Sequence, residues 1–157
     1  MEIERKWEIG GFPDGLEEVD RARMEQSYLT TRPVVRIRLE ERRGKTDRIL
    51  CIKGPGTLAR EEIELPLSRQ DYERIAALIG RPPIVKEYRA FRLPGGEKLE
   101  VSRVSGATEE PFYYAEVEFE SVEAAGAFLP PDFLGAELTG RPGSSMSALW
   151  ARREGEA

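Results

Sequence analysis

Apolar and charged residues alternate along most of the chain, and this period of two is typical of strands whose two faces meet different surroundings. In residues 2–9, for example, Ile3, Trp7 and Ile9 occupy one face, while glutamates and Lys6 occupy the other. Turn-forming stretches rich in glycine and proline separate several such segments, and their short length predicts antiparallel pairing. The expected strands span residues 2–9, 24–30, 34–42, 47–53, 59–67, 84–93, 97–105 and 112–120.

A helical period appears in fewer places. The clearest helix is expected from Ser68 to Ile79, where apolar residues recur at helical spacing, the first residue is a suitable N-cap and Gly80 follows the last turn. Weaker helical patterns cover residues 121–129 and 144–153, and a short helical turn is expected around residues 14–22. Together with the strands, these patterns predict a mainly β (α+β) fold.

Composition and charge narrow the classes of function. The 157 residues include 24 Lys and Arg against 29 Asp and Glu, so the formal net charge is −5, which argues against a general DNA or RNA binder. No run approaches the roughly 18 apolar residues of a membrane span. The chain has no histidine and one cysteine, Cys51, which excludes Ser-His-Asp chemistry, a disulfide framework and a cysteine-rich zinc site. We expect a single domain, residues 1–157, in the reducing cytoplasm, with Cys51 as a small buried residue.

The strand faces opposite the apolar residues are almost entirely charged. Arg36, Arg38 and Glu40 alternate with apolar residues in 34–42, and three glutamates do the same in 112–120. One interpretation is a solvated sheet face with ions paired across strands. Solvated faces normally include Thr, Ser and Gln, however, and the few expected helices are needed to cover the apolar face. We therefore expect an eight-stranded antiparallel closed β-barrel, with the helices packed outside and the charged face lining its lumen.

A charged lumen requires water, metal ions and a highly charged ligand, because unpaired buried charges are very costly. Its cations suit the oxygens of an oligophosphate, and its glutamates suit a hard divalent cation, Mg²⁺ or Mn²⁺, that also contacts the phosphate. The candidate phosphate-binding residues are Lys6, Arg36, Arg38, Lys53, Arg60 and Lys86. The candidate metal ligands are Glu2, Glu4, Glu62, Glu64, Glu100, Glu116 and Glu118.

Five short motifs follow one another in a fixed order along the chain. They are Glu2-Ile3-Glu4-Arg5-Lys6, Val35-Arg36-Ile37-Arg38, Ile52-Lys53-Gly54, Arg60-Glu61-Glu62-Ile63-Glu64 and Glu116-Val117-Glu118. This series resembles the CYTH superfamily, the triphosphate tunnel metalloenzymes, and covers most of the chain. The segment from Leu138 to Leu149 also resembles the C-terminal block of the family, although its Ser144 and Ser145 read as a flexible polar loop. The resemblance implies an eight-stranded tunnel in which Lys6, Arg36, Arg38, Lys53 and Lys86 hold phosphate, while Glu2, Glu4, Glu116 and Glu118 hold metal.

The chain departs from the family pattern in two strands. The sixth strand often has K-x-R, whereas here Lys86 is followed by Tyr88, so Arg89 or else Arg92 would replace the arginine through a bulge. The seventh strand commonly has E-x-D, whereas here Glu100 is followed two residues later by serine. We therefore add Arg89 to the phosphate-binding set and expect Glu100 as the sole ligand from its strand.

The leading hypothesis is a metal-dependent triphosphatase that converts a small-molecule triphosphate, foremost inorganic tripolyphosphate, into pyrophosphate and phosphate. Nucleoside and thiamine triphosphates are the related substrates. Because no histidine is available, the general base is either Lys6 or a hydroxide on the metal. Two alternatives stay open: a class IV-like adenylyl cyclase that makes cyclic AMP from ATP, and a non-catalytic module that binds polyphosphate or a nucleotide. The sequence leaves the oligomeric state open.

Overall fold

The computed structural model describes residues 1–105 and 110–155, and within them it has ten strands and three helices. The strands are β1 (Glu2–Ile9), β2 (Glu17–Thr31), β3 (Val34–Arg42), β4 (Lys45–Lys53), β5 (Ala59–Arg60), β6 (Glu62–Pro66), β7 (Ile84–Arg92), β8 (Lys98–Ser105), β9 (Phe112–Glu118) and β10 (Leu134–Glu137). The helices are α1 (Arg69–Ile79), α2 (Val122–Ala127) and α3 (Met146–Gly155). None of these helices is long and apolar enough to cross a bilayer.

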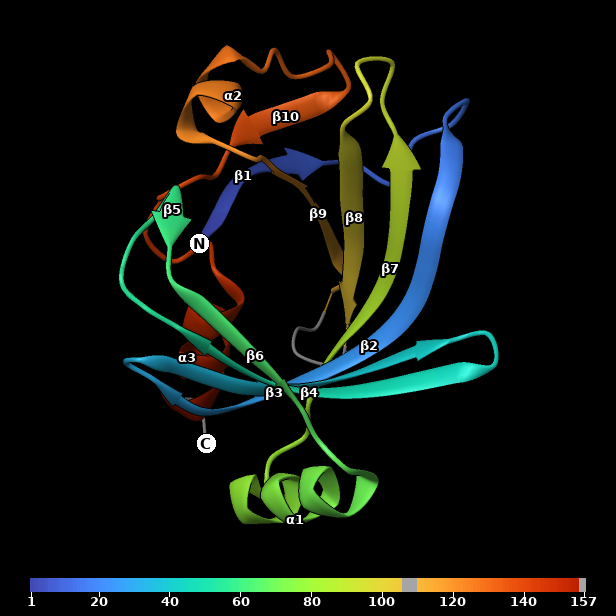
Figure 1. Cartoon of the computed structure of the whole chain (residues 1–157). Helices are drawn as coiled ribbons and strands as arrows, with labels where there is room; N and C mark the ends of the chain where they lie inside the picture. The colour runs from blue at the N-terminus through green and yellow to red at the C-terminus, as the bar shows by residue number, and fades with distance from the viewer. Residues whose placement is uncertain (106–109, 156–157) are drawn as a thin grey trace.

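The strands form one antiparallel sheet that curls around a central space (Figure 1). Their order is β10-β1-β9-β8-β7-β2-β3-β4-β6, and β5, which directly precedes β6, pairs back onto β1. That pairing joins Glu2 to Arg60 and Ile3 to Ala59, and it closes the ring. Since β5 and β6 together make the strand expected at 59–67, the barrel has the eight predicted strands, and β10 is an extra strand on β1.

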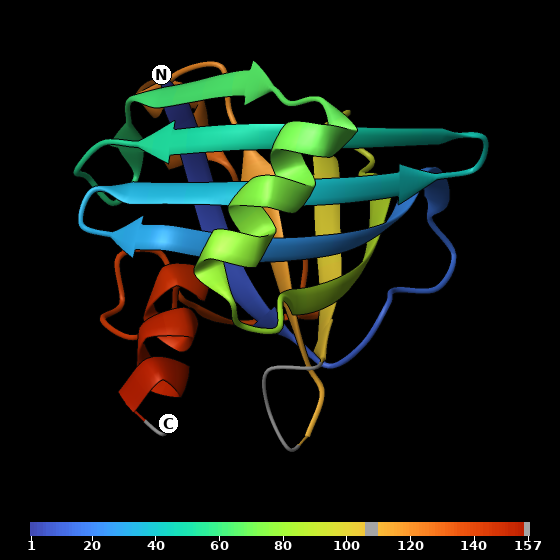
Figure 2. The ribbon, with the colours of Figure 1, turned by 90° about the horizontal axis from the view of Figure 1, so that it is seen from below.

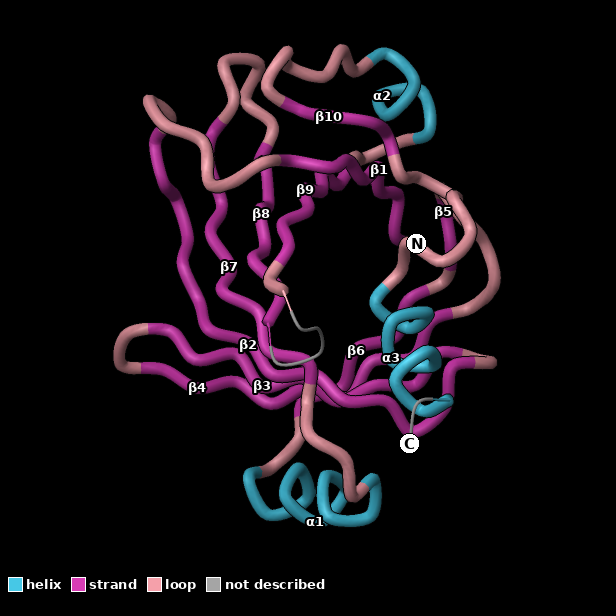
Figure 3. Tube along the Cα trace, turned by 180° about the vertical axis from the view of Figure 1, so that it is seen from behind, coloured by secondary structure: helices cyan, strands magenta, loops and turns pink. Residues whose placement is uncertain are grey.

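The helices pack around this barrel (Figure 3). Helix α1 lies across the outer face of β2, β3 and β4 (Figure 2). It begins and ends as the sequence predicts: the Ser68 hydroxyl accepts a hydrogen bond from the Asp71 amide, and Gly80 adopts a left-handed φ of 67° that ends the helix. Helices α2 and α3 confirm the two weaker patterns. The turn expected around residues 14–22 is wrong, because β2 already begins at Glu17.

The apolar face of the strands points outward, where other segments cover it. One core cluster packs Trp7, Phe91 and Val117 against the region of α2 and β10, and it includes the partly buried Phe128 and Leu134. A second cluster, buried between α3 and the barrel, contains Tyr28, Ile84, Val104 and Trp150. Its strand residues lie on the inward face, because Ile84 and Val104 share that face with Lys86 and Tyr28 lines the cavity. The outward apolar residues of the first cluster are covered, and the charged residues that alternate with them in β1, β8 and β9 line the lumen.

Arg5 is the one charged residue of β1 on the apolar face, and the structure explains it. Its guanidinium forms a bidentate ion pair with Glu137 at 2.7 and 2.9 Å and donates to the carbonyl oxygens of Ala125 and Phe128 at 2.8 and 3.0 Å. It also lies 5.0 Å from the centre of the Trp7 ring. Arg5 therefore holds α2 and β10 against β1 and has no place in the lumen.

Candidate active site

A cavity of about 460 Å³ occupies the lumen of the barrel, and charged side chains from the surrounding strands line it. It brings together all but one of the charged residues proposed from the sequence. These are Glu2, Glu4, Lys6, Arg36, Arg38, Lys53, Arg60, Glu62, Glu64, Lys86, Glu100, Glu116 and Glu118. The predicted charged lumen is therefore confirmed, and the interpretation as a solvated sheet face is wrong.

Arg89 is the exception, and its expected place in the lumen is wrong. The register of β7 against β8 is continuous from Val85 to Arg92, so no bulge turns the side chain inward. The Arg89 guanidinium lies outside the barrel, 4.1 Å from the centre of the Phe12 ring, and pairs with Glu87 at 3.1 Å. Arg92 does not replace it, since this exposed side chain donates to the Gly96 carbonyl.

Tyr88 occupies the inward position on β7 where the family often has arginine. Its hydroxyl donates a hydrogen bond of 2.8 Å to Glu100. Burial raises the pKa of the Glu100 carboxyl, and the nearby charge of Glu116 raises it further, while the Tyr88 bond acts in the opposite direction. Glu100 thus lines the cavity already hydrogen-bonded to a neighbouring strand.

The most deeply buried cations lie along one part of the wall. The exposed fraction is 9% for Arg36 and 5% each for Lys53 and Lys86. Nζ of Lys86 donates to the Tyr114 hydroxyl at 2.9 Å. Burial, together with the charges of Arg36 and Arg38, lowers the pKa of Lys86 to about 7. Lys53 is already paired with Glu2 and Glu62, at 3.2 and 3.3 Å, whereas Lys86 faces the like charges of Arg36 and Arg38, so negative charge beside Lys86 would relieve their repulsion.

Lys6 lies where β1 meets the C-terminal loop. Its Nζ donates to the carbonyl oxygen of Ser144 at 2.6 Å and lies 4.2 Å from the centre of the Tyr114 ring. Burial lowers the pKa of Lys6, Glu116 and Glu4 oppose that shift, and the nearby cations add to it. The amine is therefore held in place and is easier to deprotonate than an ordinary lysine.

A group of carboxylates faces the cations. Oxygens of Glu2, Glu4 and Glu118 all lie within 4.8 Å of one another. Burial, together with the charge of Glu116, to which Glu4 is hydrogen-bonded, raises the pKa of Glu4 to about 11. Such crowding of carboxyl groups is relieved either by a shared proton or by a cation. A set of hard oxygen ligands at this spacing fits a divalent cation such as Mg²⁺ or Mn²⁺.

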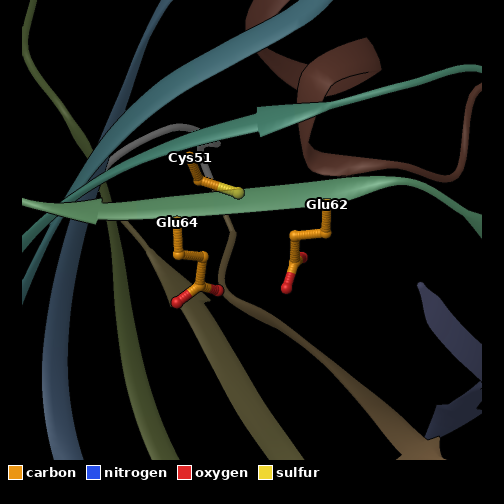
Figure 4. A group of neighbouring side chains, drawn as sticks. All are labelled: Cys51, Glu62 and Glu64. Atoms are coloured by element: carbon orange, nitrogen blue, oxygen red, sulfur yellow. The ribbon is translucent and has the colours of Figure 1, made fainter.

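A second group of possible ligands lies on β4 and β6. Glu62 and Glu64 project from β6 in the same direction, with Cys51 beside them on the neighbouring strand (Figure 4). One ligand atom from each of the three lies within 4.8 Å of the others. Burial raises the pKa of the Cys51 thiol, so the sulfur stays protonated and is a poor ligand for a hard cation. Five of the seven predicted metal ligands therefore fall into two groups, and the all-oxygen group is the better one.

The site also contains residues that sequence reasoning missed. Asp20, Glu40 and Arg42 line the cavity. The alternation in β3 already placed Glu40 on the charged face, and continuing it by two residues would have found Arg42. Asp20 escaped because β2 was expected to begin at residue 24.

The loop from Leu138 to Ser145 is the second omission, because it lines the cavity instead of lying free. The Leu138 amide donates to the Lys6 carbonyl at 2.7 Å, and the Lys6 amide donates to the Thr139 hydroxyl at 2.9 Å. The Ser144 hydroxyl donates to the Arg141 carbonyl at 2.8 Å. The expected flexible loop is thus a wall of the site, held to β1 by hydrogen bonds.

Comparisons with known proteins agree with this geometry. No family model matches the chain. The curated inorganic triphosphatase of Nitrosomonas europaea is 35% identical over 138 residues, which cover 88% of this chain and 89% of the relative. Among solved structures, the inorganic triphosphatase NE1496 has a TM-score of 0.67 at 29% identity, over 95% of this chain and 93% of that one. HpAC1 from Hippeastrum, an adenylyl cyclase by name with a dominant triphosphatase activity, has a TM-score of 0.54 at 16% identity, over 80% of this chain and 83% of that one. This likeness concerns the fold alone.

Proposed function

Because the chain belongs to the inorganic triphosphatases of the CYTH, or triphosphate tunnel, superfamily, we propose that it hydrolyses inorganic tripolyphosphate to pyrophosphate and phosphate. The observation that carries the proposal is the cavity inside the barrel, where six of the predicted phosphate-binding lysines and arginines face a group of glutamates. A phosphate chain fills such a cavity with negative charge that the cations match, and the single bond to be broken is a phosphoanhydride.

The lysines and arginines of the cavity wall would bind the substrate. Arg36, Lys53 and Lys86 are buried, so the charge that each carries once phosphate is bound acts on the phosphate oxygens with little screening by water. Arg38 adds a guanidinium that can bind two oxygens at once, while Arg60 contributes from the strand that closes the barrel. These residues hold the phosphate chain of the substrate along the lumen and neutralise the oxygens around the phosphorus that is attacked.

The glutamates support a requirement for a divalent cation. Glu2, Glu4 and Glu118 would hold Mg²⁺ or Mn²⁺, with Glu116 beside them. When bound, the cation supplies positive charge that neutralises the phosphate oxygens and lets carboxylates and phosphate share one cavity. Without such a charge, Glu4 keeps a proton, because burial and the neighbouring carboxylate raise its pKa to about 11.

Lys6 is the candidate general base. Its lowered pKa gives a neutral amine at a lower pH than an ordinary lysine would. The hydrogen bond to the Ser144 carbonyl directs Nζ within the cavity. The neutral amine accepts a proton from the attacking water, whose oxygen then bonds to the terminal phosphorus as pyrophosphate leaves.

The single cysteine supports the further proposal that the enzyme works in the reducing cytoplasm.

A release assay tests the activity. Tripolyphosphate, ATP, thiamine triphosphate and pyrophosphate are each incubated with Mg²⁺ or Mn²⁺, and also with chelator. We expect phosphate release to be fastest from tripolyphosphate and to stop with chelator. Equal release in chelator would contradict the metal requirement, and cyclic AMP from ATP with little release from tripolyphosphate would favour a cyclase.

Two arginine variants test where the substrate binds. Arg38→Ala removes a guanidinium that lines the cavity, so we expect KM for tripolyphosphate to rise by roughly tenfold or more. Arg89→Ala is the matched control, since Arg89 lies outside the barrel on Phe12. Wild-type kinetics in Arg38→Ala, or an equal effect of both variants, would contradict binding in the lumen.

A further inference from the structure

Four side chains form a continuous series of ion pairs at one part of the cavity wall. Nε of Arg38 donates to one oxygen of Glu40 at 2.7 Å, and Nη1 of Arg42 donates to the other oxygen at 2.7 Å. Nε and Nη2 of Arg42 then donate to the two oxygens of Asp20, both at 2.9 Å. We call Arg38, Glu40, Arg42 and Asp20 the ion-pair ladder.

The ion-pair ladder runs from the interior of the cavity toward solvent. The exposed fraction of the side chain is 16% for Arg38 and 9% for Glu40, but 27% for Arg42 and 30% for Asp20. Arg42 is also the last residue of β3, whereas Arg38 lies near its middle. A phosphate chain extended past Arg38 in this direction would therefore next meet Glu40, Arg42 and Asp20.

The two arginines of the ion-pair ladder differ in what they can still bind. Within the described part of the chain, Arg38 uses only Nε for its hydrogen bond, so both of its Nη groups can receive phosphate oxygens. Arg42 already donates from Nε, Nη1 and Nη2, each to a carboxylate oxygen. Arg38 thus has four N–H donors left for phosphate oxygens, whereas Arg42 has two, and the carboxylates on both sides of Arg42 neutralise its charge.

The net charge of the ion-pair ladder also argues against attraction of a further phosphate at this point. Hydrogen bonds from Arg42 hold the pKa of Asp20 below its usual value, although burial opposes the shift. Burial likewise opposes the shift of Glu40, but the charges of Arg38 and Arg42 keep its pKa low. Both carboxylates are therefore ionised at neutral pH, and two negative charges cancel two positive ones. An additional phosphate unit at this point would gain no net attraction, and it would face two carboxylates.

From this geometry we propose that the ion-pair ladder limits the length of the phosphate chain, so that tripolyphosphate is accepted and linear chains of four or more phosphates are disfavoured. The inference rests on the proposed function, because it concerns the substrate of the same cavity. Asp20 and Arg42 are specificity-determining residues, which act by withholding attraction from a fourth phosphate. They need no contact with the phosphorus that is attacked.

Asp20→Asn tests the proposal, since it keeps the shape of the side chain and removes one negative charge beside Arg42. The matched control is Glu18→Gln. Glu18 lies on the same strand and forms a bidentate ion pair with Arg21, at 2.7 and 3.0 Å, but it does not line the cavity. The two variants change the net charge equally, and only one of them changes it at the ion-pair ladder. The measured quantity is the ratio of kcat/KM for linear tetrapolyphosphate to that for tripolyphosphate, at low ionic strength.

We expect the wild-type enzyme to prefer tripolyphosphate by about tenfold or more, and Asp20→Asn to reduce this preference by about threefold to tenfold. Glu18→Gln should keep the wild-type ratio. Equal wild-type values for both chain lengths would overturn the proposal, as would an unchanged ratio in Asp20→Asn or an equal change in Glu18→Gln.

The same comparison separates this inference from the proposed function. If the wild-type protein does not hydrolyse tripolyphosphate, the proposed function fails. The dissociation constants of tripolyphosphate and tetrapolyphosphate, measured by calorimetry, then test the length limit directly. A smaller preference for the shorter chain in Asp20→Asn than in wild type and Glu18→Gln supports the inference, and identical preferences in all three proteins overturn it.

Discussion

Binding of tripolyphosphate should cause Lys86 to take up a proton, and this uptake can be counted. Burial and the charges of Arg36 and Arg38 lower the pKa of Lys86 to about 7 in the free protein. At pH 7.5 a group with that pKa is only about 25% protonated. A phosphate chain among these cations reverses the repulsion and returns the pKa toward the ordinary lysine value of roughly 10.4, so the amine becomes almost fully protonated.

The expected uptake by Lys86 is therefore about 0.75 proton at pH 7.5. Its sign and its pH dependence follow from the direction of the shift. A lowered pKa leaves the free lysine uncharged between about pH 7 and the ordinary value, so uptake is large within that window. At pH 6.0 the free lysine is already about 90% protonated, and uptake falls to about 0.1 proton.

Calorimetry in chelator measures this uptake. Tripolyphosphate is titrated into the protein in several buffers with different ionisation enthalpies, and the slope of the observed enthalpy gives the number of protons exchanged. Lys86→Met removes the amine but keeps a similar apolar stem, so the difference from wild type isolates Lys86 from the other groups and from the phosphate itself. Lys45→Met is the control, since Lys45 lies on the β3–β4 hairpin with 69% of its side chain exposed.

A difference of about 0.7 proton between wild type and Lys86→Met at pH 7.5, falling to about 0.1 at pH 6.0, would match the structure. Lys45→Met should behave as wild type at both pH values. An equal proton count in wild type and Lys86→Met at pH 7.5 would refute the reasoning, because Lys86 would then be charged before the substrate arrives.

Three further predictions follow from single side chains. Glu118→Gln should remove most metal-supported turnover of tripolyphosphate without lowering Tm, whereas Glu120→Gln, at an exposed position after β9, should leave turnover unchanged. Equal turnover in both variants would contradict a metal role for Glu118. Arg5→Ala should lower the free energy of unfolding by about 3 kcal/mol, because it leaves two carbonyls and a carboxylate without their donor. In the same denaturation experiment, Arg69→Ala, on the exposed face of α1, should leave Tm unchanged. In Lys6→Arg the rise of kcat from neutral to alkaline pH should disappear, because an arginine cannot supply a neutral base, and a retained rise would assign the base elsewhere.

The strands that the sequence predicts well are those with a contrast between their faces. In β3 and β9, apolar residues point to the covered exterior and charged residues to the lumen, so alternation is visible. The first half of β2 lacks this contrast, because Asp20 faces the cavity while Arg21 and Arg23 face solvent, and both faces read as polar. The expected strand therefore began too late, at residue 24, and Asp20 was lost from the predicted site.

Strand β10 was missed for a different reason, because no pattern in the sequence indicates it. It has four residues, Leu134–Glu137, and its pairing with β1 is a backbone contact between segments more than 120 residues apart. Gly135 allows that approach, since a Cβ there would lie 3.2 Å from the Cβ of Glu8. Neither periodicity nor composition reports such a contact. The same holds for the loop that follows β10, whose hydrogen bonds to Lys6 make it part of the site.

Alternation along a strand determines which face a residue occupies, but not what it contacts there. The sequence grouped Arg38 with the other cations and could not show that Glu40 occupies one of its nitrogens. It also placed Arg89 in the lumen on the basis of a family position, although the alternation of β7 puts Lys86 and Tyr88 inward and Arg89 outward. Where the family pattern and the period of two disagreed, the period was correct.

Pairing and discharge of several of its charges help the charged lumen to exist before any ligand binds. Glu4 keeps a proton, with a pKa raised to about 11 by burial and by Glu116, and Lys86 loses one readily, with a pKa of about 7. The two shifts have opposite signs, so the anionic and cationic parts of the site are both partly neutral in the free protein. A divalent cation would release the proton of Glu4, and a phosphate chain would return one to Lys86. The carboxylate restored on Glu4 repels phosphate and the ammonium restored on Lys86 repels a cation, so the metal and the triphosphate reinforce each other only through the direct attraction between the cation and the phosphate oxygens.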